Sequence, residues 1–210
     1  MSMFITLEGS EGSGKTSQIS PLAEFLRQKG YSVLTTREPG GTHIGNQVRA
    51  ILGDLQNTDM GKRTEILLFQ ASRAQLVEKV IIHHLEGGGV VLSDRYADST
   101  LAYQGYGYEV DLELLIPLVS FATRGLKPDL TLFLDLPVEE GLRRKAKGGE
   151  RNRLDNLDLA FYRRVQQGYY QLVQAEPQRW VVIDANRSYE EVQEEICRVV
   201  AQRLELLLNK

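Results

Sequence analysis

The segment 4–16 constrains the fold of this chain more than any other part of the sequence. Its first five residues, Phe-Ile-Thr-Leu-Glu, have the composition of a strand and run directly into Gly-Ser-Glu-Gly-Ser-Gly-Lys-Thr at 9–16. The three glycines allow a tight turn whose backbone N–H groups can converge on an anion. A helix that begins near Lys15 would add the positive end of its dipole. The segment therefore predicts a phosphate-binding loop between a strand and a helix.

Two side chains at the end of this loop have separate expected roles. The Lys15 ammonium can reach the outer phosphates, and the Thr16 hydroxyl is placed to bind a Mg²⁺ ion. The whole predicted phosphate-binding set is Gly9, Ser10, Glu11, Gly12, Ser13, Gly14, Lys15 and Thr16.

The composition is that of a soluble globular protein. The chain has 210 residues, of which 42% are hydrophobic and 25% charged, enough for one α/β domain with a substantial core. Its net charge of −3 gives no electrostatic reason to expect a nucleic-acid polymer as partner. No apolar run approaches the ~20 residues of a membrane span, and no signal peptide is recognised. With Cys197 as the only cysteine, no internal disulfide is expected, and the composition fits a cytoplasmic protein.

Runs rich in β-formers alternate with helical patterns along the chain, which favours βαβ units and a parallel sheet. The predicted strands are 3–7, 32–36, 89–93, 130–135 and 179–183. The predicted helices are 16–29, 43–53, 59–86, 111–123, 138–147, 155–175 and 189–208. We expect a single domain over 1–210, a five-stranded parallel sheet flanked by helices. In such sheets ligands bind beyond the carboxyl ends of the strands.

Polar residues follow the second, third and fourth predicted strands. The turn Thr-Arg-Glu-Pro-Gly-Gly-Thr at 36–42 can lie close to a ligand. Asp94 ends an apolar strand and is suited to Mg²⁺, while Arg95 offers a planar fork that matches a phosphate. Asp135 also ends an apolar strand and is a competing candidate for the metal.

The long predicted helix at 59–86 carries Arg73 within an apolar stripe, four residues after Phe69. One explanation is an arginine whose stem packs while its head reaches water or a carboxylate. The other is that Phe69 stacks on a base and Arg73 hydrogen-bonds the edge of that base. If residues 99–104 are helical, Ser99 and Tyr103 share one face, as do Thr100 and Gln104.

A dense basic run follows the fourth strand, with the pair Gly148-Gly149 inside it. Its cations are Arg143, Arg144, Lys145, Lys147, Arg151 and Arg153. Such a run is often a solvated helix face. Next to a polyphosphate site, we instead expect a mobile basic lid at about 143–155 that closes over the phosphates.

Together these segments resemble bacterial thymidylate kinases from Phe4 to about Tyr169. The resemblance is carried by the phosphate loop with Glu11 inside it, the Thr-Arg-Glu-Pro-Gly-Gly turn, Leu-Leu-Phe…Arg at 67–73, and Asp-Arg-Tyr followed by Ser-Thr-x-Ala-Tyr-Gln at 99–104. The order and spacing of these pieces make it specific.

The resemblance implies a nucleoside-monophosphate-kinase fold and transfer of the γ-phosphoryl group of ATP to dTMP, which gives dTDP. It implies that Mg²⁺ is held by Thr16 and Asp94, and that the enzyme is a homodimer. The residues implied to act in catalysis are Lys15, Asp94, Arg95 and Arg153. Those implied to bind ATP, besides the loop, are Arg144 and Arg151. Those implied to bind dTMP are Glu11, Glu38, Pro39, Phe69, Arg73, Arg95, Ser99, Thr100, Tyr103 and Gln104.

Within the acceptor set, Phe69 resembles the residue that stacks on thymine and Arg73 the one that bonds its carbonyl edge. Tyr103 resembles the ring that fills the space of a ribose 2′-hydroxyl. The phosphate loop carries no arginine, so a lid arginine is expected to assist transfer, with Arg153 the first choice. The sequence departs from the family in the lid, where Asn-Arg-Leu-Asp at 152–155 replaces the usual Asp-Arg-x-Glu.

Two other functions remain open at the level of sequence. A deoxynucleoside or other small-molecule kinase of the same fold would need a carboxylate base and would have less use for Arg95. A nucleotide-binding module without turnover is disfavoured by the intact Lys15, Thr16, Asp94 and Arg95.

Overall fold

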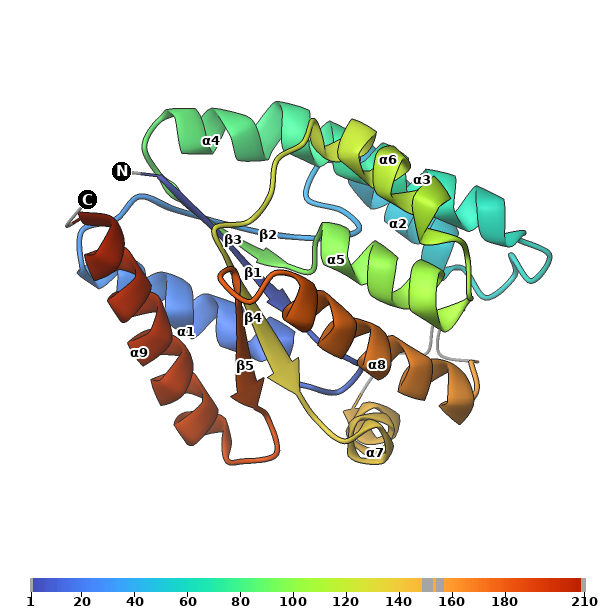
Figure 1. Cartoon of the computed structure of the whole chain (residues 1–210). Coiled ribbons are helices and arrows are strands. Elements are labelled where there is room, and N and C mark those ends of the chain that lie inside the picture. The colour runs from blue at the N-terminus through green and yellow to red at the C-terminus, as the bar shows by residue number, and fades with distance from the viewer. Residues whose placement is uncertain (1, 149–152, 154–156, 209–210) are drawn as a thin grey trace.

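The computed structural model describes residues 2–148, 153 and 157–208. Its strands form one parallel sheet in the order β2-β3-β1-β4-β5 (Figure 1). Their bounds are β1 Met3–Glu8, β2 Val33–Arg37, β3 Val90–Asp94, β4 Leu130–Asp135 and β5 Trp180–Asp184. Each begins within one residue of its predicted position, so the predicted five-stranded parallel sheet is confirmed.

The helices lie on both faces of this sheet (Figure 1). Their bounds are α1 Lys15–Gln28, α2 His43–Gly53, α3 Lys62–Leu76, α4 Ile82–Glu86, α5 Ala97–Thr100, α6 Leu112–Thr123, α7 Val138–Gly148, α8 Leu159–Ala175 and α9 Tyr189–Leu208, with the π-helical segments η1 Val77–Ile81 and η2 Leu101–Gly107. α1 and α9 pack together on one face, and α8 packs against η2 on the other.

The alternation of side chains along β1 divides the core between these two faces. Met3, Ile5 and Leu7 belong to the cluster formed with α1 and α9. Phe4 belongs to a second cluster with residues of α3 and η1. Because successive strand residues point to opposite faces, Glu8 is directed to the same side as Phe4, toward α5 and α8.

Two predicted helix starts were wrong. The helix expected from 59 begins at Lys62, because Gly61 is extended (φ −68°, ψ 148°). The helix expected from 155 begins at Leu159, because Asp158 is extended and its side chain accepts from the backbone N–H of Phe161 at 2.7 Å. The expected single helix over 59–86 is also divided by the π-helical turn η1.

Part of the predicted lid is described. α7 continues to Gly148, so the first basic residues of the lid are helical. Residues 149–152 and 154–155 lie outside the described residues. Within the part of the chain that the structure describes, no helix is long and apolar enough to cross a membrane.

Candidate functional site

A pocket of about 1230 Å³ opens at the carboxyl ends of β1, β2 and β3, between the phosphate loop, α2, α3, η2 and α7. It brings together most of the residues that the sequence predicts for the two substrates. Those that line it are Glu11, Gly12, Gly14, Lys15, Thr16, Glu38, Pro39, Phe69, Arg73, Asp94, Arg95, Ser99, Thr100, Tyr103, Gln104 and Arg144. The predicted loop residues Gly9, Ser10 and Ser13 do not line it; they support the loop, in which Ser13 Oγ donates to the carbonyl of Ser10 at 2.9 Å.

The phosphate loop depends on close backbone approaches that only glycine permits. Gly12 has φ +71°, and a Cβ there would lie 2.1 Å from the carbonyl oxygen of Gly141 on α7. Conversely, a Cβ on Gly141 would lie 2.3 Å from the carbonyl oxygen of Glu11. The first turn of α7 therefore packs backbone to backbone against the loop, which fixes the distance between the loop and the helix that begins the lid.

Lys15 lies over the loop from which it projects. Its Nζ donates to the carbonyls of Gly9 at 3.0 Å and Ser10 at 2.8 Å, and to Ser13 Oγ at 3.1 Å. The side chain is buried, and burial together with the nearby Arg95 lowers the pKa of Lys15 to about 8. The negative charge of a phosphate in the loop would raise the proton affinity of this amine.

The two predicted metal ligands meet at the mouth of the loop. Thr16 Oγ1 donates to Asp94 Oδ2 at 2.5 Å. Within the described residues, no group of three or more His, Cys, Asp or Glu side chains could hold a metal ion. A Mg²⁺ ion at these two oxygen donors would therefore take its remaining ligands from phosphate oxygens and water, which is how proteins usually hold it.

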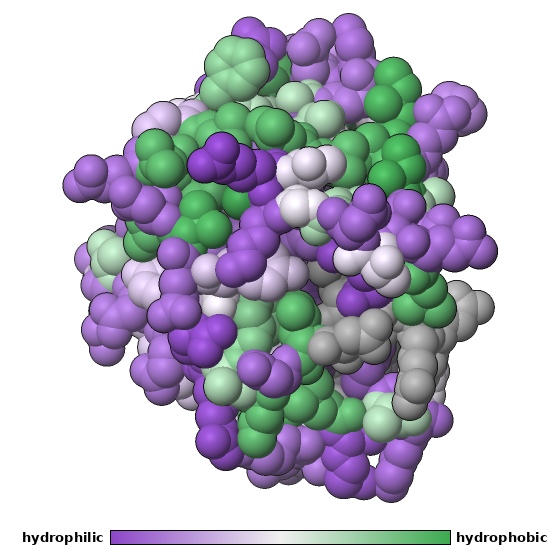
Figure 2. Space-filling model, turned by 90° about the vertical axis from the view of Figure 1, so that its right-hand side faces the viewer, coloured by the Kyte–Doolittle hydropathy of each residue, from purple (hydrophilic) through white to green (hydrophobic). Residues whose placement is uncertain are grey.

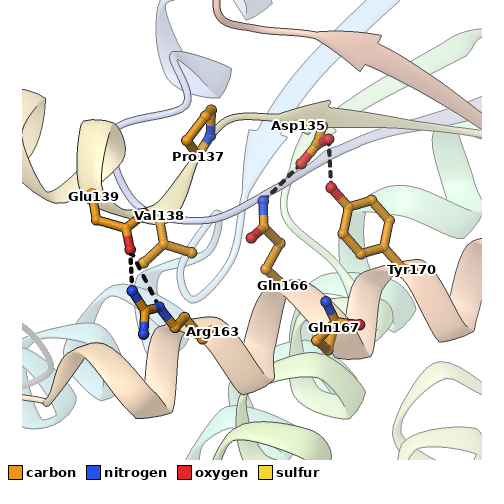
Figure 3. A pocket seen from close by; sticks show the side chains of 8 residues that line it. All are labelled: Asp135, Pro137, Val138, Glu139, Arg163, Gln166, Gln167 and Tyr170. Atoms are coloured by element: carbon orange, nitrogen blue, oxygen red, sulfur yellow. Dashed lines mark hydrogen bonds and ion pairs between the residues drawn. The ribbon is translucent and has the colours of Figure 1, made fainter.

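The competing candidate, Asp135, lies in a different place. It lines a smaller pocket of about 430 Å³ between β4, α7 and α8 (Figure 3). Its carboxylate accepts from Gln166 Nε2 at 2.9 Å and from the Tyr170 hydroxyl at 2.7 Å. Both of its oxygens are thus engaged by side chains of α8. Asp135 does not line the pocket that contains the phosphate loop.

Arg95 lies at the centre of the larger pocket. Its Nη2 donates to Glu11 Oε1 at 2.7 Å and to the Tyr103 hydroxyl at 3.0 Å. Its Nη1 donates to the carbonyl of Gly9 at 3.0 Å and to Ser99 Oγ at 3.2 Å. The guanidinium thus lies between the phosphate loop and the predicted acceptor residues, where a phosphate would meet it.

Glu11 is held as an anion by this arrangement. Burial alone would raise its pKa, but the charges of Arg95, then Lys15 and Lys145, lower the pKa to about 2. The side chain keeps about a quarter of its surface exposed (26%). Glu11 is therefore an ionised acceptor that faces the pocket at neutral pH.

Arg73 is 1% exposed and has every one of its N–H groups engaged. Nε and Nη2 contact Glu38 Oε2 at 2.7 and 2.6 Å. Nη1 donates to Gln70 Oε1 at 2.8 Å and Thr100 Oγ1 at 2.9 Å, and Nη2 donates to the carbonyl of Tyr96 at 3.0 Å. The head group reaches a carboxylate, as the packing explanation predicts, and it also lines the pocket, as the base-binding explanation requires.

Arg73 engages one carboxylate oxygen of Glu38 and leaves the other without a partner among the described residues. This second oxygen, Oε1, is buried, although the side chain lines the pocket. Burial raises the pKa of Glu38, against the opposing charge of Arg73. Thr36 Oγ1, nearby on β2, is likewise buried without a partner in the described part of the chain.

The remaining predicted acceptor residues surround Arg73. Phe69, one helical turn away on α3, is half-buried and lines the pocket together with Pro39. Gln104 on η2 is buried, and its Nε2 donates to Glu65 Oε1 at 3.0 Å. The helical segment expected over 99–104 is present, although its second half is π-helical.

The predicted lid arginines lie apart from one another. Arg144 lines the large pocket; its Nε donates to Glu140 at 2.8 Å and its Nη1 to the carbonyl of Ala185 at 3.2 Å. Arg153 is on the acceptor side instead, where Nη2 donates to Glu65 Oε2 at 2.5 Å and Nε to the carbonyl of Leu52 at 3.2 Å. Arg151 lies outside the described residues.

The structure adds residues that the sequence did not single out. Arg49 on α2 lines the pocket and donates to the carbonyl of Pro39 at 3.0 Å, and Arg37 lies in the same wall. Burial and then the charge of Arg37 lower the pKa of Arg49. One signal in the sequence could have identified Arg49: a helix that follows the turn at 36–42 turns one of its faces to the same edge of the sheet. Glu8, the last residue of β1, is a second omission.

Comparisons with known proteins agree with this geometry. A family model described as thymidylate kinase matches residues 7–196. A thymidylate kinase of Synechococcus is 52% identical, with 97% of each chain covered, and one of Roseiflexus is 49% identical, with 95% of this chain and 94% of the relative covered. The crystal structure of a thymidylate kinase from Ehrlichia chaffeensis is 35% identical and superimposes with a TM-score of 0.76 over 95% of this chain and 98% of that one. The chain therefore belongs to the thymidylate kinase family.

Proposed function

We propose that this protein transfers the γ-phosphoryl group of ATP to dTMP and releases ADP and dTDP. The observation that carries the proposal is the single pocket in which a complete phosphate loop faces Arg95, Arg73 and the other predicted acceptor residues. Membership of the family supports the same activity.

In this proposal the reaction depends on positioning and on charge neutralisation. The phosphate of dTMP is already an anionic nucleophile at neutral pH, so no strong base is needed. The main obstacle is repulsion between two polyanions, which Lys15, Arg95 and the nearby Arg49 reduce. Transfer then requires only that the attacking and leaving oxygens lie in line, since phosphoryl transfer involves little covalent chemistry by the protein.

Thr16 and Asp94 would hold Mg²⁺, because they present two oxygen donors side by side at the loop. When bound, the ion neutralises charge that develops on the phosphate oxygens. Arg144 and the other lid cations would close over ATP from α7, which packs directly on the loop.

The acceptor would be recognised on three sides. Phe69 would stack on the thymine ring, and Tyr103 would occupy the space of a 2′-hydroxyl. Arg73 would exchange one of its present hydrogen-bond partners for a carbonyl at the edge of the ring. Support comes from their arrangement: Tyr103 lies against Arg95, with the guanidinium 4.9 Å from the ring centroid, and Arg73 and Phe69 line the pocket one helical turn apart.

A coupled assay of ADP release over all nucleoside monophosphates, with thymidine included, tests the activity. We expect Mg²⁺-dependent turnover with dTMP and much less with AMP, CMP or GMP. Turnover with thymidine but none with dTMP would favour a deoxynucleoside kinase. ATP binding without any acceptor-dependent ADP release would favour a non-catalytic module.

We further propose a homodimer formed through α3 and α6, and a cytoplasmic location. α6 exposes Leu114 (70%) and Phe121 (83%), and the adjacent α3 exposes Leu67 (57%). Hydrophobic side chains are also visible in the upper part of the face shown in Figure 2. The proposed cytoplasmic location is supported by the single cysteine, which fits a reducing compartment. Light scattering at micromolar concentration should give twice the 23.7 kDa chain mass, and Phe121→Glu should shift it toward the monomer.

A further inference from the structure

Glu8 is a buried carboxylate that the proposed reaction does not use. It is the last residue of β1, is 0% exposed, and directly precedes Gly9 of the phosphate loop. The alternation along β1 turns it toward α5 and α8 rather than toward the apolar cluster under α1. A carboxylate in such a place is stable only where hydrogen-bond donors surround it.

Three donors converge on Glu8 from separate parts of the acceptor side. The backbone N–H of Tyr96 donates to Oε1 at 2.8 Å. The hydroxyls of Ser99 and Tyr169 donate to Oε2 at 2.6 and 2.9 Å. Glu8 therefore ties together the β3–α5 turn, α5 and α8.

The direction of these hydrogen bonds determines whether the hydroxyls of Ser99 and Tyr169 turn a lone pair or a hydrogen toward Arg95. A hydroxyl has one hydrogen, so Ser99 and Tyr169, which both donate to Glu8, turn their lone pairs toward Arg95. Arg95 Nη1 donates to Ser99 Oγ at 3.2 Å and to the Tyr169 hydroxyl at 3.4 Å, besides the carbonyl of Gly9 at 3.0 Å. Of these three partners, Gly9 and Tyr169 do not line the pocket, so this end of the guanidinium is anchored mainly on the buried side.

The other end of the guanidinium is the one that faces the pocket. The two hydrogens of Nη2 are donated to Glu11 and to the Tyr103 hydroxyl, both of which line the cavity, so an acceptor phosphate would share or replace these partners. The backbone of Arg95 is also constrained, because its φ of +68° lies in the left-handed region that side chains disfavour. The bond from the Tyr96 N–H to Glu8 holds the peptide that follows this turn.

We propose that Glu8 is a positioning residue for the acceptor: its carboxylate orients the hydroxyls of Ser99 and Tyr169, so that Arg95 is anchored through Nη1 and presents Nη2 to the acceptor phosphate. The inference deepens the proposed function and rests on it. An amide of the same shape cannot reproduce all three bonds, since its nitrogen is a donor: in the position of Oε2 it would no longer accept from Ser99 and Tyr169, and in the position of Oε1 it would face the N–H of Tyr96.

The proposal concerns the ionised form of Glu8, which predominates above neutral pH. Burial, and after it Asp98, raise the pKa of Glu8 to about 7, while Arg95, Ser99 and Tyr169 lower it. Asp98 is itself neutralised by Arg179, with Nη1 2.7 Å from its Oδ2. Lys15 is a further charged group near Glu8, because the charge of Glu8 acts to raise the pKa of Lys15.

The decisive variant is Glu8→Gln, assayed at about pH 8 with dTMP and ATP varied separately. We expect the KM for dTMP to rise about tenfold or more and the KM for ATP to change less than about twofold, because most side-chain contacts of Arg95 are with acceptor residues. Tyr169→Phe removes one of the two hydroxyl links and should give a smaller rise in the same constant. The double variant should be no worse than Glu8→Gln alone, within about twofold, since both act through one chain of hydrogen bonds.

Thr6→Val is the matched control. Thr6 lies on the same strand and face, and its buried hydroxyl pairs with that of Thr131 at 2.9 Å, away from Arg95. It should lower thermal stability and leave both KM values unchanged. If Glu8→Gln does not fold, Tyr169→Phe carries the test by the same split between the two KM values.

The inference is overturned if the wild type turns over dTMP and Glu8→Gln leaves the KM for dTMP within about twofold, or raises both KM values equally. A wild type that releases no ADP with dTMP overturns the proposed function instead, and this inference with it. The two failures are therefore distinguished by the wild-type assay.

Discussion

The donor and acceptor sides of the pocket are built in different ways. The phosphate loop of the donor side is one run of consecutive residues, and among the described residues Lys15 donates hydrogen bonds only to atoms of residues 9–13. The acceptor side is assembled from segments far apart in sequence. Arg73 alone contacts side chains from the β2–α2 turn and α5, 35 and 27 residues away.

The two sides also differ in how their charges are balanced. The loop offers backbone dipoles and one lysine, with no carboxylate bonded to that lysine. On the acceptor side three arginines have carboxylate partners: Arg73 has Glu38, Arg95 has Glu11, and Arg153 has Glu65. The phosphate contacts of the loop therefore depend on the loop's own residues, whereas acceptor binding depends on pairs that must be shared or exchanged with the ligand.

The largest expected effect is on the donor side. Lys15→Ala should lower kcat/KM by roughly 10³-fold or more, because it removes the one cation that the loop itself supplies. Steady-state ADP release measures this. Lys29→Ala, an exposed lysine just after α1, serves as control and should be neutral. Activity of Lys15→Ala within about tenfold of wild type would show that the loop does not dominate the donor side.

Arg153 tests whether one residue can serve both sides. Arg153→Ala should lower kcat by roughly 10³-fold with little change in the KM for ATP, if the guanidinium leaves Glu65 and reaches the transferring phosphate. Arg153→Lys should not restore full activity, since an ammonium lacks the planar fork.

Glu65→Gln separates the two possible roles of Arg153. It removes the negative charge that lies 2.5 Å from the Arg153 guanidinium and leaves the arginine in place. If both Arg153→Ala and Glu65→Gln change only the KM for dTMP, Arg153 belongs to the acceptor side and the assignment to phosphoryl transfer is wrong.

A smaller and more selective effect is expected from Arg73. Arg73→Ala should raise the KM for dTMP about ten- to a hundredfold, because it leaves a base acceptor and Glu38 unpaired in a closed site, a loss of about 1–3 kcal/mol. The KM for ATP should hardly change. Equal weakening of both substrates, together with a lower melting temperature, would instead favour a role in packing alone.

A further expected effect is a dependence of stability, rather than of activity, on pH. Glu8 has a pKa raised from 4.5 to about 7 in the folded protein, first through burial. Its contribution to the free energy of unfolding is therefore fully present below about pH 4.5 and is lost as the pH rises through 7. Denaturant unfolding of wild type and Glu8→Gln should differ increasingly in favour of the glutamine variant across this range, by a few kcal/mol at most, on the order that the linkage allows. Parallel curves would show that Glu8 titrates normally.

Local patterns were enough for the donor side and for the sheet. The strand, the glycines and Lys15 stand next to one another, so their sequence defines their geometry, and each predicted strand begins within one residue of the observed one. The helix starts at 62 and 159 were less predictable. Each depends on the backbone conformation of one residue, Gly61 or the capping Asp158, and the periodic pattern of the helix does not reveal that conformation.

The acceptor side could be named from the sequence only through resemblance. Helix spacing placed Arg73 in an apolar stripe and left two explanations open. The structure shows a buried guanidinium with all of its donors engaged, which spacing along α3 could not reveal because the partners lie on other elements. The same reason explains why Arg49 and Glu8 were missed.

The sequence by itself determined the strand–loop–helix unit, the parallel sheet and the family, because these rest on contiguous residues and on short periodic patterns. The tertiary structure alone decided which carboxylate pairs with which arginine. It placed Asp135 away from the phosphate loop, Arg153 against Glu65, and Glu8 against the hydroxyls of Ser99 and Tyr169. The physical reason is that a charge pair depends on distances of a few ångströms between elements, and these distances are fixed only when the helices pack on the sheet.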